Sequence, residues 1–259
     1  MATDHSSTTS SANSAVRKHL ATSHWTDFGD DPDIKPRGLL LVPMGSVEQH
    51  GPHLPLNTDT TIAQAWAAGM VARLRDAVVG PPLPYGASGE HAEFPGTVSI
   101  GTDALSHMLV ELGRSASTTF SALAFISGHA GNLTALQTAT AKLNYEGRPT
   151  ISFVPSWPGL NNHQVDAHAG RTETSLLLHL APAGVHLDRA EAGNTAPLPD
   201  LIDGLATRGV RSLSPNGVLG DPSGASAAEG EALLDDLIYR SVETIIKRWP
   251  EFQTARSLK

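Results

Sequence analysis

The sequence predicts an α/β fold in which a mainly parallel central sheet is covered by helices on both faces. Three observations lead to this prediction. Short apolar runs alternate along the chain with longer segments of helical periodicity. The first such run, at 38–43, ends at Pro43, which is typical of a buried strand. Gly- and Pro-rich stretches separate the two kinds of segment and cannot themselves be regular.

The expected strands are short and apolar. The runs at 38–43 and 122–126 are the clearest, and the run at 77–84 is the weakest. Because helices separate successive strands, the strands should pair in parallel. Strands are expected at 38–43, 77–84, 97–100, 122–126 and 151–154.

The expected helices carry apolar residues at helical spacing. Thr58 or Asp59 suits the N-cap of the first helix, and Leu105, Met108 and Leu109 share one face of the second. The last helix should close the domain without taking part in chemistry, and the Gly/Pro-rich stretch 190–225 should be a long surface excursion. Helices are expected at 59–75, at 103–119, at 133–146, from Thr172 onward and at 226–248.

Length and composition limit the classes of protein to consider. The 259 residues suit one domain at 21–259 behind a disordered, Ser/Thr-rich tail at 1–20. No signal-peptide core or membrane-spanning apolar run is present, so we expect a cytoplasmic protein that does not bind membranes. A formal charge of -8 without a basic cluster argues against a nucleic-acid partner. The chain has no cysteine, so a bound metal would need His, Asp and Glu ligands.

Histidines recur in four Gly- or Pro-rich clusters: EQHGPH, SGEHAEFPG, SGHAGN and DAHAGR. Loops of this composition are where a rigid scaffold places functional groups. Each cluster follows an expected strand, in the loops 44–58, 85–96, 128–132 and 156–170. Since ligands gather at the carboxyl ends of parallel strands, all four loops could converge on one edge of the sheet.

The first cluster offers Glu48, His50 and, at the start of the next helix, Asp59. Side chains two apart in an extended segment point the same way, so Glu48 and His50 can face one cavity. A carboxylate that bridges two metals, with a carboxylate and an imidazole on either side, is a reasonable design for a hydrolytic site. For these three residues alone, an equally good interpretation is that Asp59 caps the helix and His50 pairs with Glu48.

The other clusters each allow two interpretations. His129, flanked by small residues, could bind metal or be a hydrogen-bonded structural histidine. Glu173 falls in the first turn of a helix, where the helix dipole favours a carboxylate even without metal. His168 lies close to it beside Gly170. His91 could contact substrate or anchor its loop.

Four blocks, GSVEQHGPHLPLNTD, EFPGT, GHAGN and HAGRTETS, resemble the signature of the creatininase family of metal-dependent amidohydrolases over about residues 35–250. The resemblance implies a three-layer α/β sandwich and a homo-oligomer, often a hexamer. It also implies a dinuclear site with Asp59 as the bridging ligand, and His168 resembles the proton-transferring histidine of the family. The donor types suit zinc, iron or manganese. The two divalent ions would be bound by Glu48, His50, Asp59, His129 and Glu173.

One departure and one further likeness refine the expected substrate. Creatininase itself places a glutamate where this chain has Gly131, which argues against creatinine. The stretch 214–222, followed by GASAAEGE, resembles the branch associated with mycofactocin maturation. That branch implies release of a C-terminal Val-Tyr dipeptide from a modified precursor peptide. The alternatives are hydrolysis of a small cyclic amide such as creatinine and a non-catalytic scaffold that holds metal or peptide.

Overall fold

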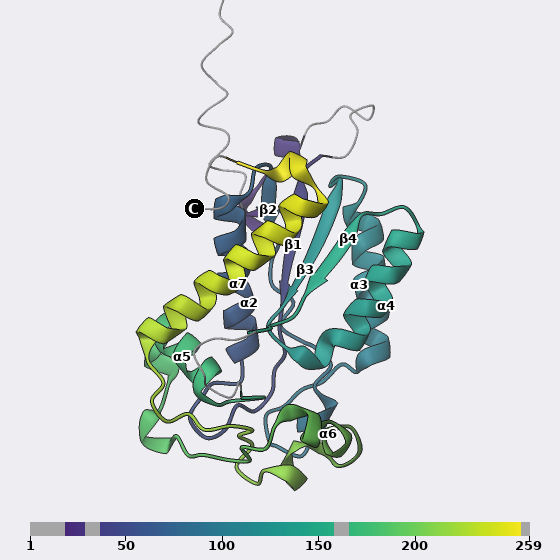
Figure 1. Ribbon diagram of the computed structural model, residues 1–259. Coiled ribbons are helices and arrows are strands. Elements are labelled where there is room, and N and C mark those ends of the chain that lie inside the picture. Colours follow the sequence, from purple (N-terminus) through teal and green to yellow (C-terminus); the bar gives the residue numbers. More distant parts are fainter. Residues whose placement is uncertain (1–18, 29–36, 158–165, 255–259) are drawn as a thin grey trace, which may run out of the picture.

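The computed structural model describes residues 19–28, 37–157 and 166–254 (Figure 1). Its centre is a four-stranded parallel sheet with the strand order β2-β1-β3-β4. The central strand β1 pairs with β3 along its whole length, from Leu39 beside Ala122 to Met44 beside Ser127. The strands are β1 (Leu39–Met44), β2 (Ala77–Val79), β3 (Ala122–Ser127) and β4 (Thr150–Phe153).

Helices cover both faces of this sheet and make three layers (Figure 1). Successive strand side chains point to opposite faces, so Leu39 and Leu41 pack with one set of helices and Leu40 and Val42 with the other. The first set is α2 (Thr58–Arg73), α5 (Arg171–Leu180) and α7 (Ala227–Arg248), and the second is α3 (Thr102–Ala116) and α4 (Leu133–Tyr145). The expected α/β sandwich is confirmed, and these five helices lie within a few residues of their expected positions.

The helices α2 and α7 pack closely because small side chains let them approach. A Cβ atom at Gly69 would lie 2.2 Å from Ile238 Cδ1, so α7 leaves no room for a larger residue there. At the same contact the buried indole of Trp66 donates a hydrogen bond to Ser241 Oγ over 3.0 Å. This packing holds α2, which begins close to the carboxyl ends of the strands.

Two of the expected strands are wrong: one is shorter than expected, and the other is not a strand. The run 77–84 forms a strand only at Ala77–Val79, because the prolines that follow Gly80 cannot donate ladder hydrogen bonds. The run 97–100 is not a strand: only Val98 pairs, in an isolated antiparallel bridge with Val47. Its neighbour Gly101, at φ +81, turns the chain into α3.

The expected surface excursion at 190–225 is also wrong, because it contains the helix α6 (Leu198–Leu213). Pro199 lies in its first turn, where a missing N–H costs nothing, and Leu201 and Val210 are buried. The helix breaks at Gly209, whose φ is +73. It packs against the short 3-10 helix η3 (Gly89–His91) and so supports a loop that carries one of the four histidine clusters.

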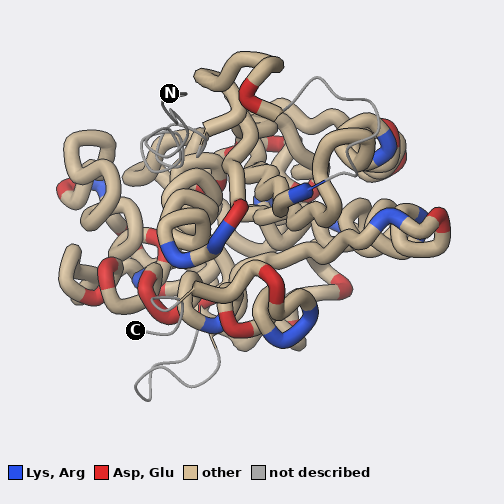
Figure 2. The backbone as a smooth tube through the Cα atoms, turned by 90° about the horizontal axis from the view of Figure 1, so that it is seen from above, with Lys and Arg blue, Asp and Glu red and all other residues tan. Residues whose placement is uncertain are grey.

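Most of the expected tail at 1–20, and part of the loop 156–170, fall outside the described residues. The structure does describe His19 and Leu20: His19 pairs with Val79 and Leu20 begins the 3-10 helix Leu20–Thr22, so these two residues do not belong to a disordered tail. Among the helices of the described ranges, none is long and apolar enough to cross a bilayer. Lys and Arg are interspersed with Asp and Glu around the molecule (Figure 2).

Candidate metal centre

The four histidine-bearing loops converge at the carboxyl ends of the strands, as the parallel sheet requires. Glu48 and His50 follow β1, and His91, His129 and His168 follow β2, β3 and β4 in turn. The rings of His50 and His168 lie 4.3 Å apart between centroids, and those of His91 and His168 lie 4.5 Å apart. All five side chains are buried.

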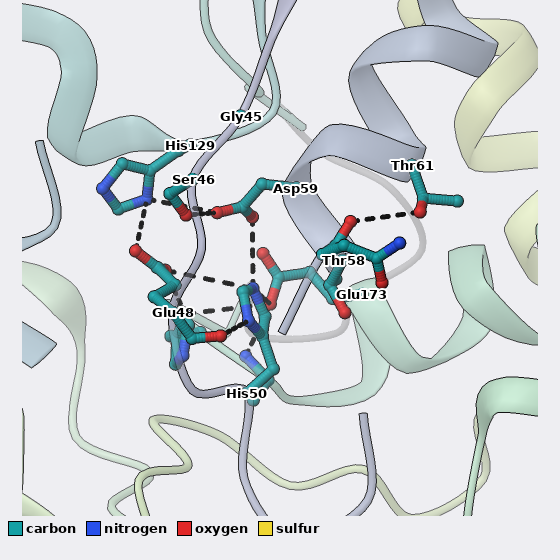
Figure 3. A network of polar contacts seen from close by, with 12 residues as sticks. Gly45, Ser46, Glu48, His50, Thr58, Asp59, Thr61, His129 and Glu173 are labelled. Atoms are coloured by element: carbon teal, nitrogen blue, oxygen red, sulfur yellow. Dashed lines mark hydrogen bonds and ion pairs between the residues drawn. The ribbon is translucent and has the colours of Figure 1, made fainter. Parts of the chain in front are cut away.

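Two more carboxylates reach this site from helix N-termini (Figure 3). Asp59 lies in the first turn of α2, where Asn57 rather than Asp59 is the N-cap. Its carboxylate accepts a hydrogen bond from Ser46 and lies 3.1 Å from His50 Nε2, so the helix-capping interpretation does not describe it. Glu173 lies in the first turn of α5, with Oε2 bonded to the N–H of Ala169 and 3.9 Å from His50 Nε2. Both helix dipoles favour these anions.

Glu48 is the most unusual group of the site. Its side chain is fully buried, and neither carboxylate oxygen has a hydrogen-bond partner among the described residues. Its nearest neighbours are His129 Nδ1, 3.2 Å from Oε2, and His91 Nε2, 3.4 Å from Oε1. A buried carboxylate without satisfied oxygens is costly unless a positive charge lies against it. Glu48 is thus one of the residues that could hold a cation at this site.

His50 and His129 each turn one nitrogen toward these carboxylates and the other toward a backbone carbonyl. His50 Nδ1 lies 3.1 Å from the carbonyl oxygen of Glu48, and His129 Nε2 lies 3.1 Å from that of Ala87. A carbonyl can only accept, so the outer nitrogen carries a proton, and in the neutral ring the inner nitrogen presents a lone pair. This is the usual arrangement of a metal-binding histidine.

The pKa values show how strongly the carboxylates attract positive charge. Burial disfavours a charged ring at His50, but Asp59, Glu173 and Glu48 outweigh burial and raise the pKa of His50 to about 10. Burial opposes protonation at His129 too, yet Glu48 raises its pKa well above the ordinary value. Burial raises the pKa of Glu173 to about 7, against the pull of His50. In the protein without metal, protons compensate the clustered negative charge.

His168 has a different electrostatic environment. Burial, followed by the positive charges of His50 and His91, holds its pKa well below the ordinary value, so the ring is neutral. Its Nε2 lies 2.8 Å from the carbonyl oxygen of Gln49, and its Nδ1 faces Glu48 Oε1 at 3.7 Å and Glu173 Oε2 at 4.0 Å. The lone pair of Nδ1 therefore points into the site.

Among the residues that the structure describes, three overlapping groups of side chains bring possible ligand atoms within 4.8 Å of one another. They fit divalent cations, because each combines carboxylate oxygens with imidazole nitrogen in a buried place. Asp59 directs Oδ2 toward His129 at 3.5 Å and Oδ1 toward His50 at 3.1 Å. It therefore lies between the group that contains His129 and the group that contains His50. The groups are Glu48–Asp59–His129, His50–His168–Glu173 and Glu48–His91–His168.

Three further residues of the site were not predicted from the sequence: Ser46, Gln49 and Glu90. Ser46 bonds to Asp59, the Gln49 side chain lies between His91 and His168, and Glu90 Oε1 lies 3.5 Å from His129 Nε2. Gln49 is flanked in the sequence by two proposed ligands, which is the one signal that could have identified it. Glu90 explains Gly131: a Cβ atom there would lie 2.5 Å from Glu90 Oε1 and 2.3 Å from His129 Nε2.

Comparison with known proteins identifies the family of this chain. The sequence model of the creatininase family, described as creatinine amidohydrolase, matches residues 21–245. The chain belongs to the creatininase family. It is 51% identical over 243 residues to the mycofactocin precursor peptide peptidase of Mycolicibacterium smegmatis, covering 92% of this chain and 96% of that protein. It is 28% identical to the creatinine amidohydrolase of Pseudomonas putida, covering 82% and 90% of the two chains.

Solved creatininase structures share the fold. A creatininase with a tryptophan-to-phenylalanine substitution superposes with a TM-score of 0.73 at 24% identity, over 90% of this chain and 99% of that one. Another neighbour, the Zn-Zn type of a creatininase with a glutamate-to-glutamine substitution, gives a TM-score of 0.72 at 24% identity, over 90% and 98%. The named relatives are a peptidase and an amidohydrolase, so this member of the family is a hydrolase.

Proposed function

We propose that this creatininase-family protein is a metal-dependent peptidase of mycofactocin biosynthesis. Its reaction would release a C-terminal Val-Tyr dipeptide from a modified precursor peptide. The relatives named mycofactocin precursor peptide peptidase, at 51% and 47% identity, support the substrate. The observation that carries the metal dependence is the buried carboxylate of Glu48, whose two oxygens have no hydrogen-bond partner among the described residues.

Two ions would share the five proposed ligands. Glu48, Asp59 and His129 would hold one, and His50, Asp59 and Glu173 the other. Asp59 would bridge them because its two oxygens face different histidines. The ligands suit zinc, iron or manganese, and related structures are described as a Zn-Zn type and a Mn creatininase.

When bound, the ions would lower the pKa of water from ~16 toward ~7 and polarise the scissile carbonyl. The residues of the chain would then handle the proton. His168 is neutral and presents Nδ1 to the site, so it would accept a proton there and return it to the departing amide nitrogen. Burial of the histidines and of Glu48 would keep bulk water from screening these charges.

A direct test incubates the metal-loaded protein with the modified precursor peptide and follows the products by mass spectrometry. We expect loss of Val-Tyr from the peptide and no such loss after the metal is removed with a chelator. His50→Ala and Glu173→Ala should each lose one ion and nearly all turnover. Cleavage by protein verified to be free of metal would show that the mechanism is wrong.

Two other functions are distinguished by the same assay. Hydrolysis of creatinine in place of the peptide would favour an amidohydrolase acting on a small cyclic amide, as in the 28% identical relative. Binding of metal and peptide without any product would favour a scaffold. His168 argues for catalysis, because a scaffold needs no residue that takes up a proton and donates it to a leaving group.

A further inference from the structure

Four imidazole rings meet at the metal centre, and the group behind each ring decides what that ring presents. For His50, His129 and His168 this group is a backbone carbonyl, of Glu48, Ala87 and Gln49 respectively. The carbonyl takes the N–H of the outer nitrogen, so each of these rings, in its neutral form, turns a lone pair inward. His91 is the exception.

The outer nitrogen of His91 faces a donor. His91 Nδ1 lies 2.9 Å from the side-chain nitrogen of Gln49. The orientation of that amide is fixed by two backbone partners: Oε1 accepts from Gly51 N over 2.9 Å, and Nε2 donates to the carbonyl oxygen of Gly217 over 3.0 Å. The amide nitrogen therefore donates to His91 Nδ1.

A neutral imidazole that accepts at Nδ1 carries its proton on Nε2. In His91 this nitrogen points inward, 3.4 Å from Glu48 Oε1. A ring that presents N–H cannot ligate an ion through that nitrogen. The group Glu48–His91–His168 is thus a hydrogen-bonding face of the site, although its atoms are close enough to hold an ion.

Gln49 also fixes the tautomer of the neighbouring His168 ring, but there a lone pair and not an N–H faces the site. Both hydrogens of the Gln49 amide are taken by Gly217 and His91, so its 3.1 Å contact with His168 Nε2 is not a donation to that ring. His168 Nε2–H donates instead to the Gln49 backbone oxygen at 2.8 Å. Both rings then have the Nε2–H tautomer, but they turn different nitrogens toward the site.

The backbone around this amide is built to hold it. Gly51 and Gly217 have φ of +64 and +82, in the left-handed region that favours glycine. A Cβ atom at Gly217 would lie 1.9 Å from Gln49 Oε1. Gln49 is itself 6% exposed, so water does not compete for its hydrogen bonds.

We propose that Gln49 is a positioning residue that makes His91 a hydrogen-bond donor to the carbonyl oxygen of the scissile amide. His168, with its ring centroid 4.5 Å from that of His91, would deliver to the nitrogen of the same amide the proton that its Nδ1 has taken up. This role rests on the proposed peptidase function. The assignment of the two rings does not, because it follows from the partners of Gln49.

Neutron diffraction from deuterated crystals of the zinc-loaded protein shows directly which nitrogens of His91 and His168 carry deuterium. We expect deuterium on Nε2 and none on Nδ1 of both His91 and His168. Deuterium on His91 Nδ1, or zinc bound to His91 Nε2, would overturn the proposal. This result is independent of whether any peptide is cleaved, so it separates failure of the tautomer assignment from failure of the proposed function.

Variants test the consequence for the reaction. Gln49→Met keeps the length of the side chain but cannot donate, and we expect kcat to fall by about 10²–10³-fold with a smaller change in KM. Gln137→Glu, on the exposed face of α4, is the control and should match the unmodified protein. Metal content, measured by plasma mass spectrometry, should stay at two ions in Gln49→Met and in His91→Ala.

Two substitutions of His91 test its role as a hydrogen-bond donor. His91→Gln places an amide donor near the position of Nε2 and should retain more activity than His91→Phe, which has no donor. Loss of an ion in His91→Ala, or equal kcat in the Gln and Phe variants, would refute the role of His91 as a donor.

Discussion

At the residue scale, the site depends on small residues that leave room for charged ones. Gly131 follows His129 by two positions, where creatininase itself has a glutamate. Here the space next to His129 Nε2 is taken by Glu90, whose carboxylate comes from a different loop. Burial opposes ionisation of Glu90, but His129 outweighs burial and lowers the pKa of Glu90, so a second carboxylate supports this ring from behind.

Gly131→Ala tests that arrangement. The added methyl group would lie 2.3 Å from His129 Nε2, so the ring must shift away from its partners. We expect zinc affinity to fall by about 10–100-fold, the usual cost of disturbing the support of a ligand. A competition titration against a chelating dye measures it.

The matched control is Gly89→Ala, because nothing lies within 4 Å of a Cβ atom at that position. Its zinc affinity should equal that of the unmodified protein. Equal affinities in the two variants would mean that the neighbours of Gly131 do not position His129.

His53 gives a prediction for the pH dependence of stability. It is fully buried, with Nε2 bonded to Thr174 Oγ1 over 2.9 Å, and Nδ1 has no partner among the described residues. Burial, aided by the charge of His50, lowers the pKa of His53 to about 4 from 6.5. The unfolded chain therefore binds more protons between these values, and the free energy of unfolding should fall as the pH drops from 6.5 toward 4.

Urea unfolding of the metal-free protein at pH 7 and pH 5 measures this effect. His53→Gln should show a smaller fall between the two pH values than the unmodified protein. His24→Gln, at a side chain that is 86% exposed, is the control and should show an unchanged fall. The same fall in all three proteins would contradict the assignment to His53.

The sequence predicted which residues meet but not every contact between them. Glu48, His50 and Asp59 could be recognised because they lie close together in a specific block. The packing of Gln49 against His91, His168 and Gly217 could not, since the last two lie more than a hundred residues away. Such a contact requires the three-dimensional fold.

At the scale of elements, the parallel strands explain most of the site. Their carboxyl ends lie at one edge, so loops from four strands bring histidines together without any local signal linking them. Helix starts supply Asp59 and Glu173. The predictions for 97–100 and for the segment of α6 were wrong. A short apolar run suggested a strand where only Val98 pairs with Val47, and the glycines and prolines of 190–225 concealed the apolar face of α6.

The packing of α2 on α7 gives a prediction at this scale. Trp66→Phe removes a hydrogen bond to Ser241 and leaves a void at a side-chain site that is 1% exposed. We expect the free energy of unfolding to fall by about 1–3 kcal/mol. Trp25→Phe, at 72% exposure, should change it little. Urea denaturation compares the two, and equal losses would show that this contact does not stabilise α2.

At the scale of the whole molecule, the three layers place one buried, carboxylate-rich site at the edge of a stable sheet. The described residues define this centre within a single chain, but the assembly is a separate question. We propose a homo-oligomer, a hexamer by resemblance to the family. Light scattering on the purified protein should give a mass near six times 27.2 kDa, and a single species of 27.2 kDa would contradict this proposal.

We propose that the carboxylates and histidines at this edge of the sheet hold a pair of ions. Anomalous diffraction at the zinc absorption edge, from crystals of the zinc-loaded protein, tests it most directly. We expect two peaks about 3.5–4 Å apart on either side of Asp59, one against Glu48 and His129 and the other against His50 and Glu173. No peak beside Asp59, or a peak between His91 and His168, would contradict it.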